Sequence, residues 1–163
     1  MPGTHLPLGK RLQEIYPPSE PCSCEICSRY CLRPGWWTPD EAEAVLRTDF
    51  AQRIMLEVSP ERTFGVLSPA FRGCEKNFAV QEYSKNGCNF LTNGLCELHG
   101  TGLQPLECRF CHHDRVGQGL ECHTAIETEW NTPRGKKAVH KWIQLIRFPW
   151  ADYFYELIKT NTR

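Results

Sequence analysis

The chain has no long hydrophobic run and no excess of charge of either sign. No apolar stretch approaches the roughly 18 to 20 residues of a membrane-spanning helix, and the start has no apolar run of signal-peptide length. Nineteen lysines and arginines balance nineteen aspartates and glutamates, so no overall field attracts nucleic acid or an anionic membrane. These absences predict a cytoplasmic protein without a membrane partner, and they disfavour nucleic acid as a partner.

Several motifs of common enzymes are also missing. The chain has no G-x-S-x-G, no phosphate-binding glycine loop, no H-E-x-x-H and no dinucleotide fingerprint. Its 163 residues suffice to bury a core as a single domain over 1–163. Whether that domain is an enzyme stays open, with its catalytic residues unknown.

What the chain does have is ten cysteines. In a secreted miniature protein they would be disulfides, but this chain is not small and the cytosol keeps thiols reduced. Clustered free thiolates then indicate metal ligands before any other role. Cys74 stands alone and suits a core position. The other nine are the candidate metal ligands: Cys22, Cys24, Cys27, Cys31, Cys88, Cys96, Cys108, Cys111 and Cys122.

Two C-x-x-C turns carry the strongest spacing signal. Cys24-x-x-Cys27 and Cys108-x-x-Cys111 would form a tetrahedral thiolate site, typical of structural zinc, if they met in space. Cys24, Cys27 and Cys31 with one remote cysteine would equally suit an iron–sulfur cluster. Spacing alone leaves both metals open, with one or two centres.

The stretch "GCNFLTNGLCELHG" predicts a β-hairpin that turns at Asn93-Gly94. A two-residue turn pairs residue 91 with 96 and 88 with 99, which places Cys88 and Cys96 on opposite faces and Cys88 beside His99. A three-residue loop with a bulge would place both cysteines on one face.

Three histidines lie beside candidate ligands. His112 and His113 follow Cys111, and His123 follows Cys122. Each could be a ligand, a hydrogen-bond donor to a ligand, or a surface residue. The basic run over 134–141 is typical of the solvated face of a helix.

The local signals predict a loop-rich α+β domain in which a hairpin or short sheet and three or four helices surround a cysteine-ligated metal site. Thr38, Pro39 and Glu41 form a helix start with a capping box, which predicts a helix over 39–49. Two further helices are expected, from Thr132 to the break at Pro149 and over 151–159. A strand is expected within 53–59, an irregular arm over 1–21, and loops over 22–31 and 103–115.

The order of these motifs resembles the YkgJ-type cysteine-cluster family, which is described as chelating zinc or iron. The resemblance spans 22–112 and leaves 123–163 as a helical C-terminal extension. It implies that the family's metal-binding cysteines correspond to Cys24, Cys27, Cys31, Cys88, Cys96 and Cys108. Gln104 replaces the usual arginine before the proline, Tyr30-Cys31 replaces an adjacent cysteine pair, and Cys22, Cys111 and Cys122 are additional.

The expected function is therefore that of a metal-binding protein whose cysteine cluster ligates an iron–sulfur cluster or zinc. A closed zinc site would be structural, and the protein would then bind a protein partner. An iron–sulfur centre would instead make it a redox enzyme or an electron-transfer protein with a redox partner.

Overall fold

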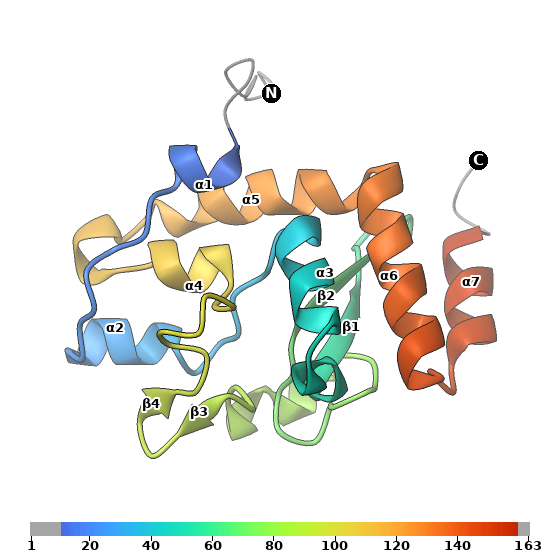
Figure 1. The fold of residues 1–163 in the computed structure, drawn as a ribbon, viewed down its shortest axis with the longest axis horizontal. Helices are drawn as coiled ribbons and strands as arrows, with labels where there is room; N and C mark the ends of the chain where they lie inside the picture. The colour runs from blue at the N-terminus through green and yellow to red at the C-terminus, as the bar shows by residue number, and fades with distance from the viewer. Residues whose placement is uncertain (1–10, 160–163) are drawn as a thin grey trace.

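The computed structural model describes residues 11–159 and has the expected α+β architecture (Figure 1). Seven α-helices lie in this part of the chain, and four of them have eight or more residues. The helices are α1 (Leu12–Ile15), α2 (Glu25–Tyr30), α3 (Pro39–Leu46), α4 (Leu106–Phe110), α5 (Gly119–Trp130), α6 (Pro133–Ile146) and α7 (Ala151–Lys159). No helix among the described residues has the length and apolar character needed to cross a bilayer.

A two-stranded antiparallel sheet lies at the centre of the core. Strand β1 (Ile54–Val58) pairs with β2 (Gly65–Pro69), with Leu56 opposite Leu67. Every residue of β2 is buried, and α3, α5 and α6 all pack against this strand. The strand expected within 53–59 is confirmed, and its partner follows a short turn.

Helix α3 begins as its capping box predicts. The Thr38 side chain accepts a hydrogen bond from the backbone N–H of Glu41, and the Glu41 carboxylate accepts one from the N–H of Thr38. The helix ends at Leu46, before the expected residue 49, because Thr48 caps a following 3-10 helix, η1 (Asp49–Arg53). Glu41 also accepts from the Arg109 side chain and so links α3 to α4.

Three fully buried tryptophans tie distant segments together. The indole N–H of Trp37 donates to the carbonyl of Leu103 at 2.7 Å, and that of Trp130 donates to the carbonyl of Trp37 at 2.8 Å. Trp142 donates to the carbonyl of Ala51 at 3.1 Å. Because a buried indole needs such a partner, these bonds join α5 and α6 to the segments before α3 and β1.

The two C-terminal helices are confirmed. Thr132 caps α6, and the helix ends at Arg147 in the left-handed conformation, two residues before Pro149. Figure 1 shows α7 lying beside α6, antiparallel to it. Phe154 of α7 is buried in the core beside Gly65 of β2 and Leu56 of β1.

Three segments expected to be irregular contain short helices. The prediction of loops over 22–31 and 103–115 is wrong for the residues of α2 and α4, which are helical. The arm predicted over 1–21 contains α1, and residues 1–10 of that arm lie outside the described residues. These helices have four to six residues. Helices of this length are unstable alone, so tertiary contacts, which the sequence pattern does not encode, stabilise them.

The hairpin forms with the expected turn but is shorter than predicted. Strands β3 (Leu91–Thr92) and β4 (Leu95–Cys96) pair 91 with 96 across Asn93-Gly94, both of which have positive φ. The predicted pairing of 88 with 99 is wrong, because the chain turns between Cys88 and Leu91 and Cys88 forms a bridge with Phe71 instead.

Gly135 allows the first turn of α6 to pack closely against the end of α5. A Cβ atom at this position would lie 2.3 Å from the carbonyl oxygen of Trp130 and 2.6 Å from its Cα. Since Trp130 is fully buried, its backbone has no room to move away. We expect Gly135→Ala to destabilise the protein by about 3 kcal/mol and to lower Tm by roughly 6 to 12 °C, whereas Lys136→Ala, at the exposed next position, leaves Tm within about 2 °C. Thermal unfolding followed by circular dichroism measures both.

Candidate metal centre

Three cysteines of the first cluster converge on one histidine. The Nδ1 atom of His113 lies 3.5 Å from Sγ of Cys22, 3.6 Å from Sγ of Cys24 and 3.4 Å from Sγ of Cys27. All four ligand atoms lie within 4.8 Å of one another. We call Cys22, Cys24, Cys27 and His113 the Cys3His group. Within the described part of the chain, this is the group of cysteine, histidine and acidic side chains that is compact enough to hold a metal ion.

The spacing of the Cys3His group matches tetrahedral coordination. A tetrahedral ion with Zn–S bonds of about 2.3 Å and a Zn–N bond of about 2.0 Å places the sulfur and nitrogen atoms about 3.5 Å apart. The three observed sulfur–nitrogen distances lie between 3.4 and 3.6 Å. The group could therefore hold a small ion such as zinc.

Backbone amides face the three sulfurs. The N–H of Cys24 donates to Sγ of Cys22 at 3.5 Å, the N–H of Cys27 to Sγ of Cys24 at 3.5 Å, and the N–H of His113 to Sγ of Cys27 at 3.3 Å. Such bonds stabilise thiolates, which are the form that binds metal. The bond from Cys27 is the main reason why the pKa of Cys24 falls to about 7, whereas burial raises the pKa of Cys27 to about 11.

His113 is held in place by its neighbours. It begins the 3-10 helix η3 (His113–Arg115), and its ring packs on the ring of His112 with centroids 4.0 Å apart. His112 is buried, and its Nδ1 lies 2.6 Å from a carboxylate oxygen of Asp114. His112 therefore supports the ring of His113 and lies outside the Cys3His group.

The Cys3His group joins two distant segments. Both the N–H and the hydroxyl of Ser19 donate to the carbonyl of Arg109, at 2.7 and 2.8 Å. The Arg115 guanidinium donates to the carbonyl of Pro17 at 2.7 Å and lies over the Phe110 ring. An ion in the Cys3His group would complete this attachment of the N-terminal segment to α4 and η3.

Four other cysteines gather between α2, α4 and the hairpin. Cys31 ends α2, Cys88 precedes the hairpin, Cys96 lies in β4 and Cys108 lies in α4; together we call them the four-cysteine group. Burial is the main cause that raises the pKa of Cys31, Cys88 and Cys108, and the charge of Cys96 adds to it in all three. Mutual effects of this kind indicate neighbouring thiols.

Backbone amides also face two sulfurs of the four-cysteine group. The N–H of Gly35 donates to Sγ of Cys108 at 3.2 Å, and a backbone bond from Phe90 lowers the pKa of Cys88 against the larger effect of burial. Among the described residues, the sulfur atoms of the four-cysteine group do not all lie within 4.8 Å of one another, as the ligand atoms of the Cys3His group do. The four-cysteine group is thus more open than the Cys3His group.

The remaining candidate cysteines lie elsewhere. Cys111 does not join Cys24 and Cys27 on one site, and its Sγ lies against Gly119. Cys122 is fully buried in the main core, and burial raises its pKa to about 12. Cys74 packs with Met55, Ala70 and Phe71, as expected of a core residue.

His123 faces a different set of groups. Its Nδ1 lies 2.7 Å from a carboxylate oxygen of Glu107, and its ring stacks on Trp36 with centroids 3.9 Å apart. The bond to Glu107 is the main cause that raises the pKa of His123. Of the three candidate histidines, only His113 lies in a compact ligand group of the described chain. Its position two residues after Cys111 was the one sequence signal for it.

Gly35 allows the segment before α3 to approach Cys108. A Cβ atom at Gly35 would lie 2.7 Å from Sγ of Cys108 and 2.9 Å from its backbone nitrogen. We expect Gly35→Ala to displace Cys108 and to destabilise the protein by about 2 kcal/mol. The matched variant Gly119→Ala, whose Cβ would meet only Sγ of Cys111 at 3.3 Å, should change stability by less than about 1 kcal/mol. Urea unfolding of both variants measures the difference.

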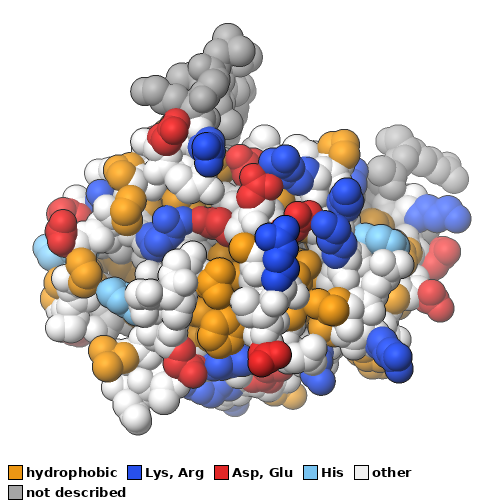
Figure 2. All heavy atoms as spheres, viewed as in Figure 1, with side chains coloured by type: hydrophobic (Ala, Val, Ile, Leu, Met, Phe, Trp, Pro, Cys, Tyr) orange, Lys and Arg blue, Asp and Glu red, His pale blue; other side chains and the backbone are white. Residues whose placement is uncertain are grey.

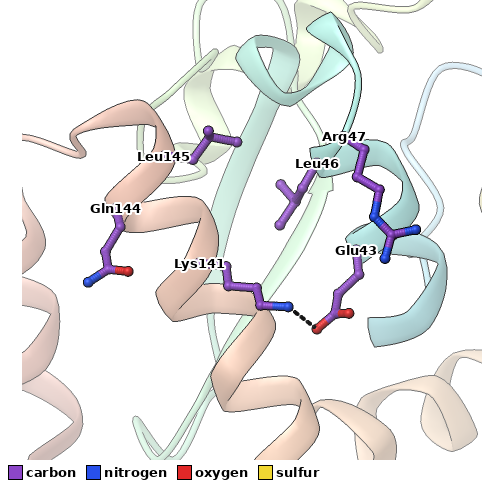
Figure 3. A pocket seen from close by; sticks show the side chains of 6 residues that line it. All are labelled: Glu43, Leu46, Arg47, Lys141, Gln144 and Leu145. Carbon is purple, nitrogen blue, oxygen red and sulfur yellow. Dashed lines mark hydrogen bonds and ion pairs between the residues drawn. The ribbon is translucent and has the colours of Figure 1, made fainter.

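A surface hollow of about 430 Å³ lies between α3 and α6 (Figure 3). Lys141 and Glu43 form an ion pair of 3.2 Å across it, and Leu145 is half exposed at its edge. In the face shown by Figure 2, positive and negative side chains are interspersed, so this face has no patch of one sign.

No protein-family model, curated protein or solved structure matches the chain. The fold and the site therefore define its class: a small α+β domain with a Cys3His group that could hold a metal ion.

Proposed function

We propose that this is a metal-binding protein and that the Cys3His group holds a structural zinc ion. The observation that supports this most strongly is the position of His113 Nδ1, nearly equidistant from three sulfurs at the edge length of a zinc tetrahedron. Four protein ligands leave no open position for a substrate, so the ion stabilises the fold and does not act as a catalyst.

The four-cysteine group supports a second centre. An iron–sulfur cluster of the [4Fe–4S] type carries its four cysteines on four separate iron atoms, and so requires thiolates that are further apart than the ligands of a single ion. Cys31, Cys88, Cys96 and Cys108 are less compact than the Cys3His group, which is compatible with such a cluster. These four positions are also among those to which the YkgJ-type resemblance assigns metal binding. With a cluster there, the protein would transfer electrons to or from a redox partner.

Metal analysis of anaerobically purified protein tests the proposal. We expect about one zinc per chain, together with iron, acid-labile sulfide and an absorption band at about 400 nm. Zinc at about one equivalent without iron would limit the proposal to the Cys3His group and would favour a zinc-stabilised module that binds a protein partner. Protein that is colourless, free of metal and still stably folded would contradict both centres.

A further inference from the structure

A cavity of about 410 Å³ lies beside the four-cysteine group, between β1, α4, α5 and the segment that follows α2. Its wall includes Cys108, but most of its polar groups belong to neither group of metal ligands: Arg33, Trp36, Glu57, Glu107 and His123. Ligand pockets in proteins are typically of about 300 to 1,000 Å³ with a few converging polar groups. The cavity thus has the size and lining of a small-molecule site.

Glu57 is a carboxylate in an unusual place. It lies on β1 within the central sheet, and burial is the main cause that raises its pKa. Among the described residues, no lysine, arginine or histidine lies within ion-pair distance of it. Glu57 is half-buried, and a carboxylate withdrawn from water without a cationic partner is costly, so Glu57 is a group that a bound cation would stabilise.

The histidine in the same cavity does not serve as that partner. His123 is bonded through Nδ1 to Glu107 and stacked on Trp36. Glu107 and His123 therefore compensate each other's charge. Their pairing leaves Glu57 with the Trp36 side chain as its hydrogen-bond partner and with no cationic partner of its own in the wall.

Arg33 supplies the opposite charge in the lining of the same cavity. It is exposed, and no carboxylate of the described chain lies within ion-pair distance of its guanidinium. Its charge nevertheless lowers the pKa of Glu57, against the larger effect of burial. Arg33 and Glu57 therefore face the same space without contact.

We propose that this cavity binds a small zwitterion of the amino-acid class, with its ammonium group on Glu57 and its carboxylate on Arg33. The rings of Trp36 and Tyr30, which also line the cavity, would contact the side chain of the ligand. The volume equals that of roughly a dozen water molecules, which suits a free amino acid and excludes a folded peptide. A simple cation or anion would satisfy only one of the two charges. The inference goes beyond metal binding and does not depend on which metal is held.

The test uses the metal-loaded full chain and the twenty standard amino acids, one at a time, in ligand-observed NMR followed by calorimetry. We expect at least one to bind with a Kd below about 1 mM. Its decarboxylated amine and its N-acetyl derivative should each bind at least about tenfold more weakly, because each lacks one of the two charges.

Two variants assign the charges. Glu57→Gln should weaken binding of the amino acid and the amine at least about tenfold and leave the N-acetyl derivative unaffected, and Arg33→Gln should weaken the amino acid and the N-acetyl derivative but not the amine. Glu61→Gln and Arg47→Gln, exposed and outside the cavity lining, are the matched controls and should change nothing.

Absence of binding by any amino acid below about 10 mM, in protein with its full metal content, would overturn the inference and leave the metal centres untouched. Unchanged affinity in both cavity variants would also overturn it. Arg33 is exposed, so Arg33→Gln decides the question even if Glu57→Gln does not fold.

Discussion

Cys27→Ser is expected to lose the ion of the Cys3His group and to release the N-terminal segment from α4. Cys27 is the buried cysteine of the group, and its sulfur has the shortest distance to His113, 3.4 Å. A serine hydroxyl is a far poorer zinc ligand than a thiolate. We expect affinity to fall at least about a hundredfold, which corresponds to about 3 kcal/mol.

Zinc content after dialysis against a chelator measures this loss. Hydrogen exchange should show faster exchange at Ser19, whose N–H donates to Arg109, because metal binding and local folding are coupled. His113→Ala should behave in the same way. Cys74→Ala, a buried cysteine outside both groups, is the control and should keep its zinc. Full zinc retention in both Cys27→Ser and His113→Ala would show that the Cys3His group is not the site.

Cys108→Ser is expected to remove the second centre while the zinc ion stays bound. The Cys108 thiol lies in the four-cysteine group, and burial is the main cause that raises its pKa well above the usual value. A bound metal would reverse this by taking the sulfur as thiolate. Because Cys108→Ser lacks this thiol, the iron and the absorption at about 400 nm should be lost together.

The matched variant is Cys111→Ser, which changes the other cysteine of the same C-x-x-C. It should keep both metals, because Cys111 belongs to neither group. Equal metal loss in Cys108→Ser and Cys111→Ser would contradict the four-cysteine group and favour a site built from the whole C-x-x-C turn. Loss of zinc in Cys108→Ser would show that the two centres are not independent.

The proposed centres would use seven of the ten cysteines, three in the Cys3His group and four in the four-cysteine group. The Cys3His group attaches the N-terminal segment to η3, and the four-cysteine group brings together the end of α2, the hairpin and α4. Figure 1 shows α2, α4 and the hairpin on the side of the molecule away from α6 and α7. We infer that metal ligation stabilises the part of the fold that has the least regular structure.

Local chemistry in the sequence was sufficient for the elements with strong end signals. The capping box at Thr38 and Glu41 specified the start of α3, Asn93-Gly94 specified the hairpin turn, and Pro149 separated α6 from α7. Each of these signals acts through backbone conformation or a hydrogen bond within a few residues, and can therefore be seen without the fold.

The sequence by itself determined the α+β class of the domain and identified the cysteines as the candidate metal ligands. Only the tertiary structure decided how the cysteines divide: His113, not the Cys108-x-x-Cys111 turn, completes the group of Cys24 and Cys27. It also brought Glu57 and Arg33 to one cavity. The physical reason is that ligands of one ion, or walls of one cavity, come from segments some 25 to 90 residues apart, and their approach depends on how the whole core packs.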